Sequence, residues 1–157
     1  FIICPDNTVH EALIHRDLQS HAPWLHIAEP VAAKAKSSNF KRLAILGTRS
    51  LMEGPVYRQQ LIPMEIQPVT PAQEERNHIN SIIFDRLVFN KGTEKDLSDL
   101  LSIIRRMQSE DRCDAVVLGC TELPLILNDH VSPLPTLDST RLLARAAIRE
   151  SIGAPPV

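Results

Sequence analysis

Short apolar runs alternate along this chain with longer segments in which apolar residues recur every three or four positions. Runs of the first kind predict strands, and they lie at 1–4, 24–27, 41–46, 66–69, 115–119 and 134–137. Segments of the second kind predict helices, and they lie at 10–18, 29–38, 51–62, 71–88, 93–108 and 140–152. Strands that alternate with helices indicate βαβ units. The pattern therefore predicts an α/β fold in which helices cover both faces of a parallel sheet.

The stretch 115–124 carries the strongest chemical signal. Its apolar run ends at Gly119 and is followed directly by Cys120. Thr121 and Glu122 then lead into a second apolar segment, which predicts the start of a helix. Open α/β sheets bind ligands at the carboxyl ends of their strands, where this thiol is expected. Backbone N–H groups in a first helical turn would favour a thiolate or a bound carboxylate there. On spacing alone, Cys120 fits a reactive thiol and a small buried apolar residue equally well.

A second turn of the same form follows the first predicted strand and contains Asp6, Asn7 and Thr8. If the two turns face each other across a cleft, Asp6 and Cys120 would reach opposite faces of one carbon of a small carboxylate. One group would take the proton as general base, and the other would return it from the opposite side. The alternative is that Asp6 only caps the following helix in an Asx-type turn.

Such a reaction passes through an enediolate-like intermediate, which needs hydrogen-bond donors for the substrate carboxylate. Asn7, Thr8, Thr121 and free backbone N–H groups in both turns are candidate donors. Glu122 could accept a hydrogen bond from a substrate ammonium group or orient the neighbouring thiol.

Composition limits the other classes of function. The chain is 43% hydrophobic and carries 17 Lys and Arg against 19 Asp and Glu, so its net charge of −2 argues against a nucleic-acid surface. No apolar run approaches the roughly 18 residues of a membrane-spanning helix. Three cysteines without a Cys-x-x-Cys pair favour a reducing cytoplasm. The histidines form no ligand cluster, and Gly47-Thr48 lacks the dinucleotide fingerprint, so we expect neither a metal nor a nucleotide cofactor.

Several motifs occur in order along almost the whole chain: Asn7-Thr8-Val9-His10, Leu25-His26-Ile27-Ala28, Leu46-Gly47-Thr48 with Met52-Glu53 and Tyr57, Gly119-Cys120-Thr121-Glu122, and Asp138-Ser139-Thr140-Arg141. Together they resemble the motifs of the aspartate/glutamate racemase superfamily. The resemblance implies a pseudo-symmetric two-lobe α/β fold, a cofactor-independent racemase or isomerase, and often a homodimer. The implied substrate is a small amino acid, aspartate- or glutamate-like, or a related carboxylate. Thr48 could contact this ligand or only cap a helix.

The chain departs from the family pattern at the first acid/base position. Family members carry a cysteine directly before Asn-Thr, where this chain has Asp6, and Cys4 is displaced by two residues. The reference pKa of an aspartate, near 3.9, differs from that of a thiol, near 8.5, although burial can raise it. Two further hypotheses follow: a cofactor-free decarboxylase that protonates from Cys120 alone, and a degenerate member that only binds a ligand.

The resemblance also predicts how the chain divides into lobes. Residues 39–130 are expected to form the second α/β lobe, and 1–38 with 131–157 the remainder of the first lobe. The chain begins inside a predicted strand without an initiator Met. We therefore expect the first lobe to lack its N-terminal part.

Overall fold

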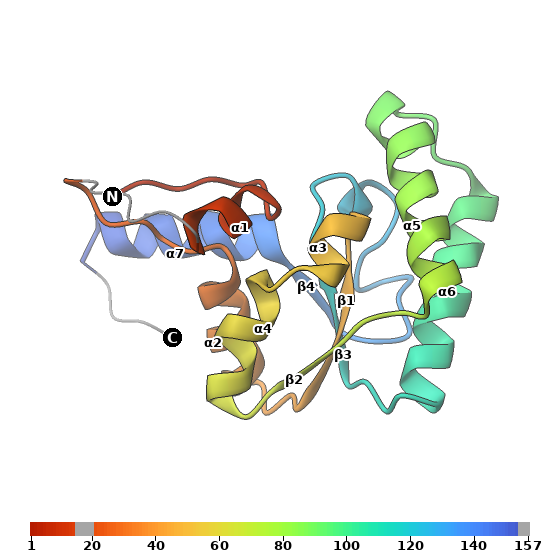
Figure 1. Cartoon of the computed structure of the whole chain (residues 1–157), viewed down its shortest axis with the longest axis horizontal. Coiled ribbons are helices and arrows are strands. Elements are labelled where there is room, and N and C mark those ends of the chain that lie inside the picture. Colours follow the sequence, from red (N-terminus) through yellow and green to blue (C-terminus); the bar gives the residue numbers. More distant parts are fainter. Residues whose placement is uncertain (15–20, 154–157) are drawn as a thin grey trace.

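A parallel four-stranded sheet lies at the centre of the structure, a computed structural model that describes residues 1–14 and 21–153 (Figure 1). The spatial order of its strands is β2-β1-β3-β4. Their bounds are β1 Arg42–Leu46, β2 Gln67–Val69, β3 Ala115–Leu118 and β4 Thr136–Asp138. All neighbouring strands are parallel, and β1 pairs with β3 in a register that sets Leu46 beside Leu118. The predicted α/β class with a parallel sheet is confirmed.

Helices precede, connect and follow the strands. The α-helices are α1 Val9–Ile14, α2 Ala28–Ser37, α3 Arg49–Glu53, α4 Val56–Leu61, α5 Gln73–Asp85, α6 Glu94–Ser109 and α7 Ser139–Ser151. Three short 3-10 helices are η1 Ile62–Met64, η2 Leu87–Phe89 and η3 Leu123–Leu125. None of the helices in the described ranges has the length and apolarity needed to cross a membrane.

Alternate residues of the two central strands enter two separate hydrophobic cores. Ala44 and Leu46 of β1 pack with α5 and α6, whereas Leu43 and Ile45 pack with α2 and α4. Figure 1 accordingly shows α2 and α4 on one side of the sheet and α5 and α6 on the other. Because both faces are covered, every residue of β3 is buried, which is why this strand is continuously apolar in the sequence.

The order of the strands defines where a ligand can enter. From β1 the chain moves outward to β2 through α3 and α4, and then returns through α5 and α6 to β3, on the other side of β1. The connections therefore leave in opposite directions at the carboxyl ends of β1 and β3. Open α/β sheets bind ligands at such a switch point.

Several predicted elements differ from the structure. The predicted buried strand at 1–4 is wrong: it forms one isolated bridge, from Ile2 to Trp24, and Phe1 and Ile3 are exposed. The N–H of Ile2 donates to the carbonyl of Pro23 at 2.9 Å, and the carbonyl of Ile2 accepts the N–H of Leu25 at 3.0 Å. The predicted strand at 24–27 is also wrong, because this run forms no strand beyond that bridge. The predicted helix at 51–62 is divided into α3 and α4, because the chain is extended at Gly54 before Pro55.

Other predictions match the structure or remain open. Thr93 caps α6 in a capping box with Asp96, as the sequence indicates. The predicted helix at 10–18 is confirmed as far as residue 14, and residues 15–18 lie outside the described ranges. Within 131–157, β4 pairs with β3 and α7 packs against α2. The division into two lobes stays a prediction.

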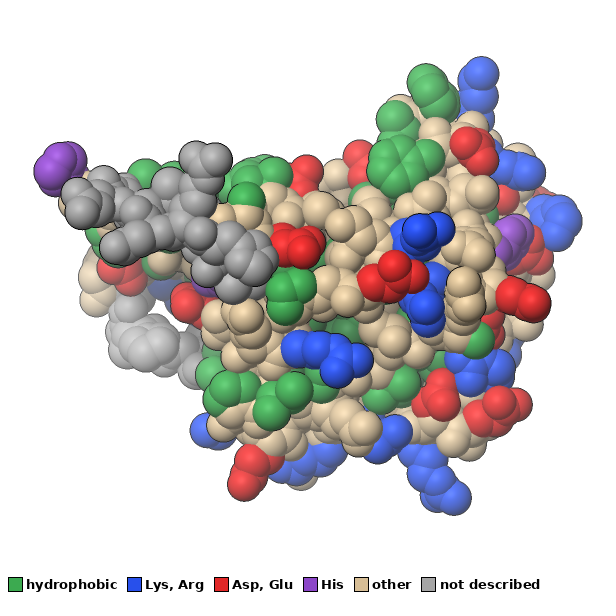
Figure 2. Space-filling model, viewed as in Figure 1, with side chains coloured by type: hydrophobic (Ala, Val, Ile, Leu, Met, Phe, Trp, Pro, Cys, Tyr) green, Lys and Arg blue, Asp and Glu red, His purple; other side chains and the backbone are tan. Residues whose placement is uncertain are grey.

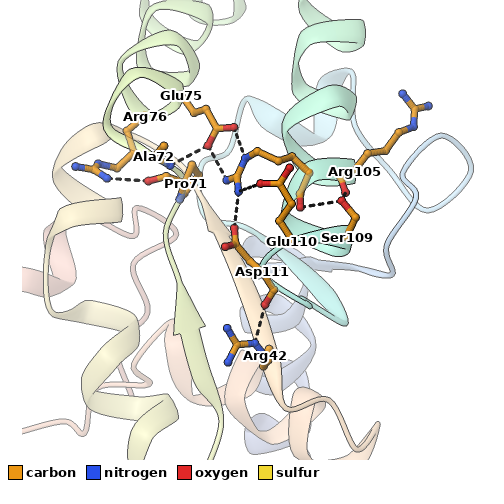
Figure 3. Close-up of polar contacts among 10 residues, drawn as sticks. Arg42, Pro71, Ala72, Glu75, Arg76, Arg105, Ser109, Glu110 and Asp111 are labelled. Carbon is orange, nitrogen blue, oxygen red and sulfur yellow. Dashed lines mark hydrogen bonds and ion pairs between the residues drawn. The ribbon is translucent and has the colours of Figure 1, made fainter.

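Arg106 joins the helices that connect β2 to β3 (Figure 3). Its guanidinium donates two hydrogen bonds to the Glu75 carboxylate, at 2.6 and 2.7 Å, and a third to Asp111 at 2.8 Å. Arg42 of β1 donates in turn to the backbone carbonyl of Asp111 at 2.8 Å. Helices α5 and α6, the loop before β3 and strand β1 are thus tied together at the end of the sheet where β3 begins.

We expect Arg106→Lys to lower the free energy of unfolding by about 1 kcal/mol, because an ammonium group cannot reproduce the bidentate pairing of a guanidinium. Urea unfolding measures the change. Arg105→Lys is the matched control, since the Arg105 guanidinium points away from this network and makes no hydrogen bond or ion pair within the described residues. Equal effects of the two substitutions would contradict the role given to Arg106.

Candidate active site

The turns that follow β1 and β3 are in direct backbone contact. The N–H of Gly119 donates to the carbonyl of Leu46 at 2.7 Å. A Cβ atom at Gly119 would lie 2.9 Å from that carbonyl oxygen and 2.4 Å from a methyl group of Leu51. Only glycine therefore fits, and the contact sets Thr48 and Cys120 at neighbouring positions on the carboxyl edge of the sheet.

Cys120 and Glu122 form a hydrogen-bonded pair within one turn. The Cys120 thiol donates to Glu122 Oε2 at 2.8 Å, and the Thr121 hydroxyl donates to the same oxygen at 2.8 Å. Cys120 is half-buried and Thr121 is exposed. The turn thus holds the thiol against a carboxylate.

Electrostatics keep this thiol protonated. Burial, together with the hydrogen bond to the Glu122 carboxylate, raises the pKa of Cys120 to about 12, and the charge of Asp6 contributes in the same direction. Burial alone would raise the pKa of Glu122, but the hydrogen bonds from Cys120 and Thr121 outweigh it and lower that pKa. Near neutral pH the pair is therefore a thiol beside a carboxylate, which can give a proton but does not readily take one.

The N-terminal turn contributes Asp6 and Thr8. Asp6 Oδ1 accepts the backbone N–H groups of Thr8 and Val9, at 2.8 and 3.1 Å, and so caps α1. Oδ2 of the same carboxylate has no hydrogen-bond partner in the described part of the chain. The Thr8 hydroxyl lies 3.2 Å from the hydroxyl of Thr48, which also accepts the N–H of Leu51 as the N-cap of α3.

Asn7 is buried and holds the N-terminal turn in place. Its Oδ1 accepts the hydroxyl of Tyr57 at 2.6 Å, and its Nδ2 donates to Ser139 Oγ at 2.9 Å. Ser139 donates in turn to the carbonyl of Leu118 at 2.9 Å. Leu118 directly precedes the Gly119-Cys120 turn, so one hydrogen-bond network connects the two halves of the site. Asn7 therefore has a positioning contact in addition to the substrate contact expected from the sequence.

The seven residues predicted for the site line one cleft of about 400 Å³, although this proximity does not test their roles. They are Asp6, Asn7, Thr8, Thr48, Cys120, Thr121 and Glu122. Sequence reasoning missed the side chains that line the cleft from α5 and η2, which are Asn80, Ile83, Phe84 and Val88. It also missed Ser50 of α3. Phe84 and Val88 are large exposed hydrophobic residues, a signal that appears only once the tertiary structure is known.

The expected helix after Cys120 is wrong, because the segment forms only the three-residue η3 before the chain turns again at Asn128. It has no regular first helical turn to act on the thiol. The backbone N–H groups of Cys120 and Thr121 nevertheless have no acceptor within the described residues. They remain available to a ligand in the cleft.

His10 does not line the cleft. It is buried, its Nε2 lies 3.0 Å from the Cys4 carbonyl oxygen, and its ring packs edge-on against His26 at a centroid distance of 4.7 Å. These contacts hold the N-terminal segment in place from outside the cleft. Across residues 1–14 and 21–153, no three His, Cys, Asp or Glu side chains are grouped so as to hold a metal ion.

Comparisons of the sequence and of the structure with known proteins all lead to amino-acid racemases and their homologues. The family model for Asp/Glu/Hydantoin racemase matches residues 1–147. The crystal structure of a proposed Asp/Glu racemase from Yersinia pestis superposes with a TM-score of 0.88 at 28% identity, covering 96% of this chain and 66% of that one. PH1733, an aspartate racemase homologue from Pyrococcus horikoshii OT3, gives 0.86 at 26% identity with the same two coverages.

A relative in sequence is the broad specificity amino-acid racemase RacX of Bacillus subtilis (strain 168). It is 23% identical over 150 residues, which are 94% of this chain and 63% of RacX. The chain thus spans slightly less than two thirds of the length of these three proteins.

We expect Ser139→Ala to destabilise the protein by about 1–3 kcal/mol, because it removes the acceptor of the buried Asn7 Nδ2 and the hydroxyl donor to the Leu118 carbonyl. Thermal and urea unfolding measure the loss. Ser151→Ala is the matched control: it removes the same hydroxyl from the exposed end of α7, where the Ser151 hydroxyl donates to the backbone carbonyl of Ile148 at 2.7 Å. A loss no larger than that of the control would contradict the network.

Alkylation of Cys120 by iodoacetamide should be slow at pH 7.5 and rise only toward its raised pKa. Glu122→Gln should move this rise to lower pH by at least one unit, since it removes the negative charge that disfavours the thiolate. Peptide mass spectrometry follows Cys120 and Cys113 in one digest. Cys113, whose pKa burial and the Asp111 charge raise to about 11, is the internal control. An unchanged Cys120 profile in Glu122→Gln would show that the carboxylate does not control the thiol.

Proposed function

The chain belongs to the Asp/Glu/hydantoin racemase family, and on that premise we propose that it is a cofactor-independent amino-acid racemase or isomerase. It would move a proton at the α-carbon of a small amino acid or a related carboxylate. The observation that carries the proposal is the shared cleft of Cys120, with its carboxylate partner Glu122, and the free oxygen of Asp6.

In the proposed reaction Asp6 takes the α-proton and Cys120 donates a proton to the opposite face of the carbanion. The Cα–H bond breaks toward Asp6 Oδ2, the electron pair delocalises into the carboxylate, and the S–H bond of Cys120 supplies the new Cα–H. The raised pKa of Cys120 supports the donating direction. In the reverse direction the thiolate must form, and a substrate ammonium beside Glu122 would favour it by offsetting the carboxylate charge.

Hydrogen-bond donors support a site for the substrate carboxylate. The hydroxyls of Thr8 and Thr48 lie next to each other, and the free N–H groups of Cys120 and Thr121 are in the facing turn. Donors aimed at developing charge in a partly buried site typically contribute about 3 kcal/mol each to lowering a barrier. Thr121 and Glu122 would in addition orient the thiol and the ammonium group.

The substrate, the location and the assembly are parts of the proposal. RacX is named as a broad-specificity amino-acid racemase, which supports amino acids with different side chains as substrates of a protein of this kind. A reducing cytoplasm is proposed from the cysteine pattern, and a homodimer from the family resemblance.

A one-sided reaction is the second candidate, and the geometry of Asp6 supports it. Since Oδ1 of Asp6 accepts two backbone N–H groups as a helix cap, this carboxylate has a structural role that needs no catalysis. Cys120 alone could then protonate a carbanion left by loss of carbon dioxide. Such a decarboxylase would work from one face of the substrate.

Proton NMR in deuterium oxide distinguishes these reactions with the 157-residue chain and a panel of L- and D-amino acids. For a racemase, deuterium should enter the α-carbon from either enantiomer, and Cys120→Ala should lower that exchange at least a thousandfold. Asp6→Asn should lower it at least a hundredfold, because the base is lost while the amide oxygen can still cap α1.

Cys113→Ala is the control, since it is the same substitution at the opposite end of β3 and away from the cleft. It should leave exchange within a factor of two or three. If the Asp6→Asn variant still releases carbon dioxide from a substrate, the decarboxylase hypothesis would replace the racemase hypothesis. A folded wild-type chain that neither exchanges the α-proton of any member of the panel nor releases carbon dioxide from it would contradict both reactions and favour ligand binding without turnover.

A further inference from the structure

One wall of the cleft is apolar. Ile83 and Phe84 of α5 and Val88 of η2 line it, and the side chains of Phe84 and Val88 remain 51% and 49% exposed. Figure 2 shows hydrophobic side chains gathered at this end of α5. Large side chains that stay exposed at the edge of a polar cleft are typical of a surface that contacts a ligand.

The ionisable groups in the lining carry only negative charge. Besides the Cys120 thiol they are Asp6 and Glu122, and no Lys, Arg or His lines the cleft in the described part of the chain. The two arginines nearest in sequence are paired elsewhere: Arg49 with Glu53 at 3.6 Å and Arg86 with Asp96 at 3.1 Å. Among the described residues, the cleft therefore offers no cation to a second substrate carboxylate.

The polar groups already described account for the common part of an amino acid. Glu122 suits the ammonium group, while the Thr8 and Thr48 hydroxyls with the free N–H groups of the Cys120 turn suit the carboxylate. With the α-carbon between Asp6 and Cys120, the wall of Phe84 and Val88 is left for the substrate side chain. A zwitterion adds no net charge to this cleft, whereas aspartate or glutamate adds a further negative charge.

We propose that the cleft selects amino acids with an apolar, uncharged side chain, with Phe84 and Val88 as the specificity-determining contacts. The inference rests on the proposed function for the orientation of the substrate. It differs from the acidic substrate that the family resemblance implies, and its basis is the missing counter-charge and the apolar wall.

Binding and turnover are measured separately so that the two proposals can fail separately. Isothermal titration with L-leucine, L-methionine, L-aspartate, L-glutamate and L-lysine gives the Kd of each for the 157-residue chain. We expect leucine and methionine to bind at least ten times more tightly than aspartate and glutamate. We expect Phe84→Arg to reverse that order, since it removes apolar contact and supplies the absent cation. Deuterium exchange is recorded on the same five amino acids.

Phe89→Arg is the matched control. Phe89 is 62% exposed on η2 but does not line the cleft, so the same substitution there should leave all five Kd values within a factor of two. Circular dichroism establishes that each variant is folded. Because Phe84 is half exposed, the arginine can extend into solvent without disturbing the core.

Each outcome bears on the inference. Tighter binding of aspartate, glutamate or lysine than of leucine and methionine by the wild-type chain overturns it, even if the preferred amino acid exchanges its α-proton. Binding that follows the expected order without exchange on any amino acid supports the inference and contradicts the proposed racemase. An equal response to Phe84→Arg and Phe89→Arg, or no binding of any of the five, also overturns it.

Discussion

The contact between the backbone of Gly119 and the carbonyl of Leu46 is the constraint on which the site depends. The two turns approach to 2.7 Å because neither Gly47 nor Gly119 has a side chain to hold them apart. Any larger residue at position 119 would have to displace the backbone of β1 or the Leu51 side chain. Because the two turns are so close, the residues that directly follow the glycines, Thr48 and Cys120, line one cleft.

Local patterns predicted most of the sheet and its helices, because burial on both faces leaves continuous apolar runs in strands such as β3. The run at 1–4 is equally apolar, yet it forms no strand beyond one bridge. Whether such a run becomes a strand depends on a neighbour to pair with, which local sequence does not reveal. The same limit applies after Cys120, where an apolar segment forms a single 3-10 turn instead of a helix.

The two turns of the site could be predicted from the sequence, whereas the side chains that surround them became visible only in the tertiary structure. Asp6 and Cys120 are more than a hundred residues apart in sequence, but their similar turns and the family motifs predicted a common cleft, and both line it. Phe84 and Val88 gave no such signal. In the sequence Val88 continues the apolar stripe of the helix predicted at 71–88 and looks buried, whereas it is 49% exposed, and Phe84 looks like any other apolar residue outside that stripe. The partners of Asn7 were also hidden, although Tyr57 and Ser139 both belong to motifs shared with the family.

The bond between Asn7 and Ser139 spans 132 positions of the sequence. During translation Asn7 is therefore made well before Ser139, which follows only with the start of α7. The sheet and its two cores can assemble earlier from β1, β2 and β3. The cleft consequently stays incomplete in the nascent polypeptide until Ser139 emerges with the start of α7, and a ligand can engage the finished site only after that point.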